Sequence, residues 1–176
     1  MTKSNSKARD VARIGLMTAV LVASKWVLAS LPNIELVTFL IMVFTKKFDR
    51  KVLFVIPAYI IIEILVFGFE IMWVLAYCYV WPILYLLTRF FGKSESSVPL
   101  AVLSGLFGLF FGFLCSFPYL FVTTGTNPDA SLSSAIAWWI SGIPFDIIHG
   151  VSNFVIMLVL YKPVSSVFNR MIQNRT

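Results

Sequence analysis

Long apolar segments occupy most of this chain and decide what it can fold into. A helix that crosses a bilayer needs about 20 mostly apolar residues, and windows of that length predict helices at 12–31, 34–45, 51–69, 71–91, 98–122 and 134–161. Only 12% of the 176 residues are charged, whereas soluble domains carry about 25%. We therefore expect an all-α membrane protein: a six-helix transmembrane bundle forming a single domain over residues 1–176.

Two of the predicted helices depart from a simple span. The segment 34–45 is too short to cross a bilayer squarely, which predicts a partial or tilted span. The last segment is long and contains Pro144, which predicts a bend. No linker divides the chain, and the sequence shows no internal repeat. Many secondary transporters consist of two similar halves, so this absence counts modestly against that class.

The basic residues are distributed asymmetrically between the connections. Apart from Lys25, they precede the first helix, join the second to the third, or follow the fourth and sixth: Lys3, Lys7, Arg9, Arg13, Lys46, Lys47, Arg50, Lys51, Arg89, Lys93, Lys162, Arg170 and Arg175. The opposite connections, LPNIE, GFEIM and TTGTNPDASLSS, contain no lysine or arginine. The positive-inside rule then predicts a multi-pass protein of the cell membrane with both termini in the cytoplasm. Topology also explains the net charge of +6 without a nucleic-acid partner.

Signatures of catalysis are absent from the sequence. GKS at 92–94 resembles the end of a phosphate-binding loop, but Leu87 stands where that loop needs a glycine. A single histidine, His149, cannot supply a histidine-rich metal site, and the common hydrolase motifs are missing. Cys78 and Cys115 fall inside predicted helices, where they are interpreted as small apolar side chains. We expect no enzymatic activity, no metal site and no cofactor in this chain.

Three polar residues share one face of the last predicted helix. Asp146, His149 and Asn153 have the spacing i, i+3, i+7, which turns them together toward the bundle interior. Charged side chains at membrane depth are costly and often functional. These residues either join the helices by hydrogen bonds, or they have a direct role in binding or gating a ligand. Asp146 and His149 are close enough in sequence to bond each other. We expect both beneath a pocket, with only Asp146 near enough to touch a ligand.

Four further charged residues lie toward the predicted outer side. Lys25 and Glu63 are each about 9 Å inside the outer ends of their helices, so they are candidate partners. They form a structural ion pair, or Lys25 serves as the counter-ion of an anionic ligand. Glu35 and Glu70 are expected at the outer mouth, where water solvates a charge, and Asn33 lies in the turn beside Glu35. All five residues are candidates for ligand binding.

Aromatic residues form a ladder on the fourth predicted helix. They recur at a spacing of four: Trp73, Tyr77, Trp81 and Tyr85. Tyr77 and Trp81 are deep enough to hold a flat organic ligand by stacking, although packing in the core explains the pattern equally well. Trp73 and the pair Trp138 and Trp139 suit interfacial anchors, and Trp139 is also a candidate for ligand contact.

Small residues recur at intervals of four on two helices. On the fifth they form a stripe that is expected to pack closely against another helix: Ser104, Gly108, Gly112 and Ser116. On the first helix Gly15, Ala19 and Ala23 form a second stripe. This one is interpreted as a face for a partner protein.

Several segments together resemble the S component of an energy-coupling factor vitamin transporter. They are the basic N-terminus followed by ARIGLMTAVLVA, PNIELVTFL after the first helix, WVLAYCYVW in the fourth, and a last helix that begins GIPFDIIHGVSNF and ends LVLYKP. The resemblance covers nearly the whole chain. It implies a membrane-embedded binding protein whose site lies at the outer side, capped by the loops after the first, third and fifth helices.

The same resemblance implies partners and a class of ligand. The small-residue motif of the first helix, matched here by Gly15 and Ala19, docks a transmembrane T component that couples to two cytoplasmic ATPase subunits. ATP is then used by the partner subunits. The ligand is a vitamin or related micronutrient, with pantothenate, cobalamin and queuosine-type compounds as candidates, and Lys25 favours an anion such as pantothenate.

Two other classes of protein fit the same residues. One is a small proton-coupled secondary transporter in which Asp146 and His149 relay protons. It is distinguished by uptake through this chain alone, driven by a pH gradient. The other is a structural or assembly membrane protein, which is distinguished by the absence of saturable binding to any small molecule.

Overall fold

The computed structural model describes residues 3–122 and 128–173, and within these ranges the protein is helical, without strands. Its elements are α1 (Lys3–Val27), α2 (Val37–Phe48), the 3-10 helix η1 (Asp49–Lys51), α3 (Val52–Phe67), α4 (Ile71–Phe91), α5 (Ser97–Leu109), α6 (Phe111–Val122) and α7 (Pro128–Gln173). Three segments are long and apolar enough to cross a membrane: Ile71–Phe91, Ser97–Phe121 and Ser131–Met171. The predicted all-α fold with helices suited to a bilayer is confirmed.

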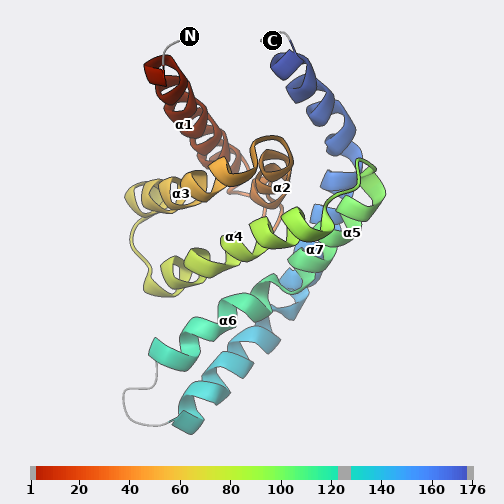
Figure 1. Ribbon diagram of the computed structural model, residues 1–176. Helices are drawn as coiled ribbons and strands as arrows, with labels where there is room; N and C mark the ends of the chain where they lie inside the picture. Colours follow the sequence, from red (N-terminus) through yellow and green to blue (C-terminus); the bar gives the residue numbers. More distant parts are fainter. Residues whose placement is uncertain (1–2, 123–127, 174–176) are drawn as a thin grey trace.

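The last two predicted helices differ most from their predicted bounds. The predicted helix 98–122 is interrupted at Phe110, which separates α5 from α6. Phe110 still donates its N–H to the carbonyl one turn back at 3.1 Å, so the interruption is confined to a single residue. The last helix is longer than predicted and continues through both Pro144 and Pro163. The C-terminal part of α7 turns away from the direction of its first part, and both chain termini lie at the same end of the molecule (Figure 1).

The short helix α2 lies at the centre of the fold. Every residue from Val37 to Thr45 is buried, as expected for a helix that is apolar on all sides. Its 12 residues extend only about 18 Å. The surrounding helices each supply a fully buried side chain to the same core: Leu21 from α1, Tyr59 from α3, Leu84 from α4, Leu100 from α5 and Met157 from α7. The segment interpreted as a partial span is thus the element on which α1, α3, α4, α5 and α7 pack.

Small residues bring α5 and α6 against α7. A Cβ atom on Gly108 would lie only 2.8 Å from the Cα of Gly150, so the two backbones are in direct contact. One turn further on, the N–H of Gly112 donates to the carboxylate of Asp146 at 2.8 Å. We call Gly108, Gly112 and Gly150 the glycine seam. The predicted packing role of the stripe on the fifth predicted helix is confirmed. Its contact on α7 is Gly150, which the spacing pattern did not identify.

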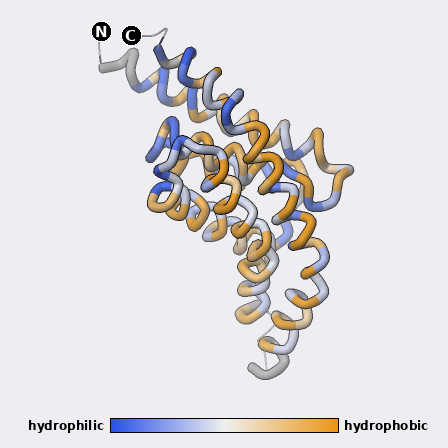
Figure 2. The backbone as a smooth tube through the Cα atoms, turned by 90° about the vertical axis from the view of Figure 1, so that its right-hand side faces the viewer, coloured by the Kyte–Doolittle hydropathy of each residue, from blue (hydrophilic) through white to orange (hydrophobic). Residues whose placement is uncertain are grey.

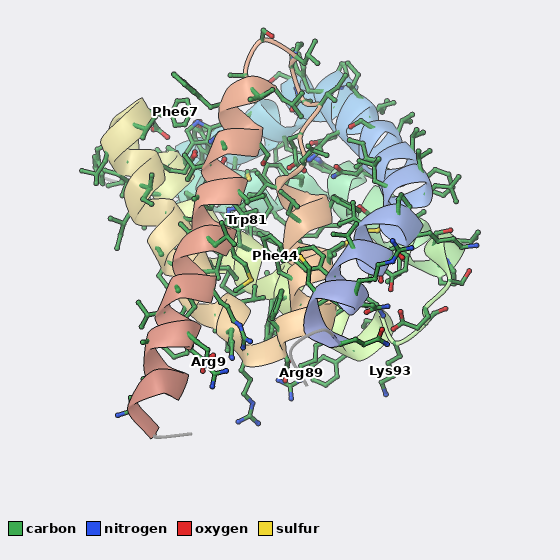
Figure 3. All side chains as sticks on the ribbon, turned by 90° about the horizontal axis from the view of Figure 1, so that it is seen from above. Arg9, Phe44, Phe67, Trp81, Arg89 and Lys93 are labelled. Atoms are coloured by element: carbon green, nitrogen blue, oxygen red, sulfur yellow. The ribbon has the colours of Figure 1, made fainter. Side chains whose placement is uncertain are left out.

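The surface of the molecule is apolar over most of its length and polar toward the end that holds the termini. Large apolar side chains are widely exposed, as at Leu65 and Phe121, each 78% accessible, and hydrophobic colours cover most of the helices in Figure 2. Figure 3 shows Arg9 and Lys93 at one side of the molecule and Phe67 at the other. An exposed apolar surface of this extent suits contact with lipid.

The basic connection between α4 and α5 is held by a lysine. The ammonium of Lys46 donates to the carbonyls of Gly92 and Ser94 at 2.6 and 2.9 Å and lies 3.2 Å from the carboxylate of Glu95. In this segment carbonyl oxygens therefore face a cation, whereas a phosphate-binding loop directs N–H groups at an anion. The local geometry agrees with the rejection of GKS as a nucleotide motif.

Candidate functional site

A pocket of about 360 Å³ opens between α1, α3 and α4. Four of the predicted binding residues line it: Lys25, Glu63, Glu70 and Tyr77. Its remaining wall is mostly apolar: Ile60, Ile64, Phe67, Gly68, Trp73 and Val74. Phe67 lies on the side of the molecule away from Arg9 and Lys93 (Figure 3). We refer to this cavity as the α1–α3–α4 pocket.

The tight turn between α3 and α4 shapes the pocket. Gly68 ends α3 with φ of 90°, a backbone conformation that favours glycine. Glu70 then caps α4, accepting hydrogen bonds from the N–H groups of Met72 and Trp73 at 3.2 and 2.7 Å. Because the turn is this short, the end of α3 and the start of α4 stand side by side. Glu63 and Tyr77 consequently lie across the pocket from the end of α1.

Lys25 and Glu63 form an ion pair in the pocket. Lys25 lies in the last turn of α1, which ends at Val27 rather than at residue 31 as predicted, so its ammonium reaches the pocket rim. The side chain of Lys25 is 30% accessible, whereas that of Glu63 is 8% accessible. The ammonium also lies 3.4 Å from the Tyr77 hydroxyl and 5.0 Å from the ring centre of Phe67. The second carboxylate oxygen of Glu63, Oε1, is buried and has no hydrogen-bond partner among the described residues.

The aromatic ladder runs from the pocket into the core. Trp73 and Tyr77 have ring centres 6.0 Å apart, and Tyr77 and Trp81 are 5.2 Å apart. Tyr77 lines the pocket, while Trp81 lies one turn deeper, only 2% exposed, and packs edge-on against Tyr59. Trp81 therefore forms part of the packing beneath the pocket and does not line its wall.

A second polar cluster lies between the loop after α1 and the middle of α7. The Nε2 atom of His149 bonds the carboxylate of Glu35 at 3.1 Å, and the two side chains are 5% and 18% accessible. Glu35 also accepts from the N–H of Thr38 at 2.9 Å, at the start of α2. Asp146 instead bonds the backbone of Gly112. The expected bond between Asp146 and His149 is not formed, because Asp146 bonds Gly112 of α6 whereas His149 bonds Glu35 in the α1–α2 loop.

The environment of Glu35 also differs from the solvated outer mouth that we predicted. Its side chain is only 18% accessible and bonds both His149 and the N–H of Thr38. Glu35 thus joins the α1–α2 loop to α7.

The other predicted residues lie outside the α1–α3–α4 pocket. The carbonyl of Asn33 accepts from Ser152 at 3.1 Å, which fixes the α1–α2 loop to α7. Asn153 is fully buried, and neither atom of its amide finds a partner within the described ranges. Trp139 packs against Phe113 of α6 with ring centres 5.1 Å apart. The loop expected to close the site after the fifth predicted helix includes 123–127, which lies outside the described residues.

The small-residue stripe on α1 faces outward. Gly15, Ala19 and Ala23 are all exposed, and a Cβ on Gly15 would meet nothing within 4 Å in the described part of the chain. This face is therefore not used for packing inside the protein.

Two residues of the pocket wall were missed or assigned another place. Phe67 lies four positions after Glu63 on α3, and this spacing, which puts both on one helix face, was an available signal. Trp73, interpreted as an interfacial anchor, is part of the pocket wall and also contacts Trp138 with ring centres 6.2 Å apart. The pocket thus combines one ion pair, one hydroxyl and three aromatic rings.

The α1–α3–α4 pocket is suited to binding a small polar molecule. Among the residues that the structure describes, no group of three acidic, histidine or cysteine side chains could hold a metal ion. Comparison of the chain with protein-family models, with curated proteins and with solved structures finds no match. The chemistry of the pocket itself therefore carries the functional argument.

Proposed function

We propose that this protein is the membrane-embedded substrate-binding S component of an energy-coupling factor importer for a vitamin or related micronutrient. In this proposal six segments cross the cell membrane, both termini are cytoplasmic, and the whole chain is one substrate-binding domain. The observation that carries it is the α1–α3–α4 pocket, because Lys25, Glu63, Glu70 and Tyr77 meet in one cavity remote from the basic residues labelled in Figure 3. Pantothenate, cobalamin and queuosine-type compounds are the candidate ligands.

The proposal assigns the outward face of α1 to a partner. Gly15, Ala19 and Ala23 would contact the transmembrane T component, which couples to two cytoplasmic ATPase subunits. Their exposure supports this assignment, since a small-residue face allows another helix to approach closely. ATP would be hydrolysed by the partner subunits, and the chain itself would act neither as an enzyme nor as a cofactor carrier.

Native mass spectrometry of gently purified protein tests the proposal. We expect a retained vitamin-sized molecule on the chain and co-purifying ATPase and T subunits. A chain that carries no small molecule and brings down no ATPase subunit, when isolated from its own cells, contradicts the proposal.

A proton-coupled secondary transporter is the second candidate. The observation that favours it is the gathering of three titratable side chains, Glu35, Asp146 and His149, around one stretch of α7. In that case the chain alone, in liposomes, should take up its substrate when a pH gradient is imposed. Uptake that requires ATPase subunits excludes this alternative.

A further inference from the structure

The ammonium of Lys25 occupies a small cage within the α1–α3–α4 pocket. One wall is the carboxylate of Glu63, which forms an ion pair with it. Two others are aromatic: the ammonium lies 5.0 Å from the ring centre of Phe67 and 5.3 Å from that of Tyr77. A carboxylate combined with aromatic faces is the environment that proteins use to bind ammonium groups. We call Glu63, Phe67 and Tyr77 the ammonium cage.

Lys25 is the movable member of this arrangement. Glu63 is 6% exposed, and the ring of Tyr77 packs against those of Tyr59 and Trp81, so both side chains are held in place by the fold. Lys25 carries its charge on a flexible four-carbon stem, lies in the last turn of α1 and is 30% accessible. Its side chain can leave the cage for solvent without unfolding any helix.

The pocket is short of cations once Lys25 is paired. Its charged lining residues are one lysine and two carboxylates, Glu63 and Glu70. Glu70 is engaged with the first N–H groups of α4, but Oε1 of Glu63 is buried without a partner among the described residues. A buried acceptor without a partner is costly, so a ligand that donates a hydrogen bond to this oxygen would be favoured. An anionic ligand would face two carboxylates and a single ammonium that is already paired with one of them.

We propose that the α1–α3–α4 pocket selects substrates that carry an organic ammonium group, which takes the place of the Lys25 ammonium in the cage. The ligand's N–H groups donate to both oxygens of Glu63, and its positive charge rests against Phe67 and Tyr77. Lys25 is then displaced toward solvent. This inference rests on the proposed function, since it takes the pocket as the substrate site, and it narrows the class of substrate: among the candidate ligands it disfavours pantothenate, which is an anion.

Binding of three matched probes tests the inference. Benzylammonium, benzyl alcohol and benzoate share one ring and differ in charge, and ligand-observed NMR on the full chain in detergent measures their affinities. We expect affinity to fall in the order benzylammonium, benzyl alcohol, benzoate. Because Lys25 occupies the cage in the structure, a ligand must displace it, so Lys25→Met should bind benzylammonium about tenfold more tightly or better, while Lys25→Arg should not.

Two further variants keep the test decisive if Lys25→Met does not fold. Phe67→Leu removes one wall of the cage at a residue that is 46% exposed, and it should weaken benzylammonium more than benzyl alcohol. Phe69→Leu is the matched control, because Phe69 is 67% exposed and does not line the pocket. Glu63→Gln should lower the affinity for benzylammonium about tenfold or more, since it removes the charged acceptor.

The outcomes separate this inference from the proposed function. If benzoate binds more tightly than benzylammonium, or if Phe67→Leu and Phe69→Leu have equal effects, the ammonium inference is wrong while a substrate-binding role survives. Undetectable binding of benzylammonium to both the natural chain and folded Lys25→Met also overturns it. Failure of the proposed function itself is read from native mass spectrometry, which does not depend on the charge of the probe.

Discussion

The bond between His149 and Glu35 should contribute measurably to stability. His149→Ala removes the imidazole that lies 3.1 Å from the Glu35 carboxylate, at a place where the side chains are 5% and 18% accessible. A hydrogen bond to a charged group contributes about 1.5 to 3 kcal/mol. Glu35 keeps its bond to the N–H of Thr38 at 2.9 Å, so its carboxylate is only partly deprived of partners. We therefore expect His149→Ala to lower the free energy of unfolding by about 2 to 3 kcal/mol.

A double-mutant cycle isolates this contribution from other losses. His149 also packs against Phe111 with ring centres 4.8 Å apart, and that contact is lost whether or not Glu35 is present. Comparing Glu35→Ala, His149→Ala and the double variant therefore cancels it. We expect a coupling free energy of about 1 to 3 kcal/mol, so the double variant should be less destabilised than the sum of the single ones.

Thermal unfolding of the detergent-solubilised chain is the assay. For a protein of this size about 1 kcal/mol corresponds to 2 to 4 °C in Tm, so His149→Ala should melt roughly 4 to 12 °C below the natural chain. The corresponding cycle between Asp146 and His149 is the control, since these two do not bond each other directly. Strict additivity of Glu35→Ala and His149→Ala would show that the bond contributes nothing and would refute this reasoning.

Four other substitutions separate packing from function. Gly108→Ala should destabilise the protein by about 1 to 3 kcal/mol, because the new methyl group would meet Gly150 at 2.8 Å; an unchanged Tm argues against backbone contact. Gly15→Leu should leave Tm and ligand binding unchanged but abolish ATP-dependent uptake with the T component; normal uptake removes the docking assignment. Tyr77→Ala should weaken ligand binding, whereas Trp81→Ala should chiefly lower Tm, as its side chain is buried beneath the pocket; the reverse pattern places the ligand deeper than proposed.

Local spacing predicted more of the architecture than of the site. The bounds of α4 agree with the predicted segment 71–91, because a continuous apolar run between a glutamate cap and a glycine has clear ends. The packing stripe was equally readable, since Gly108 and Gly112 repeat along one face. The pairing of Lys25 with Glu63 followed from matching depths in two helices.

Contacts between distant segments were beyond the reach of periodicity. Asp146 and His149 share a helix face, but one full turn of separation lets them address different neighbours, Gly112 and Glu35. The charge of Glu35 gave no sign that its side chain turns inward to bond the N–H of Thr38 and the ring of His149. The central position of α2 was equally hidden, because a short apolar helix reads the same whether lipid or protein surrounds it.

The placement of Lys25 at the end of α1 couples the pocket mechanically to the exposed face of the same helix. α1 runs from Lys3 to Val27 without a proline, so it should tilt as a stiff rod. Gly15 on its exposed face and Lys25 in the pocket are separated by about 15 Å along the axis at 1.5 Å per residue. A neighbouring helix that pushed on α1 at Gly15 would therefore shift the Lys25 ammonium relative to Glu63 on α3. Ligand binding beside Lys25 and contact of a partner helix at Gly15 would therefore both depend on the position of α1.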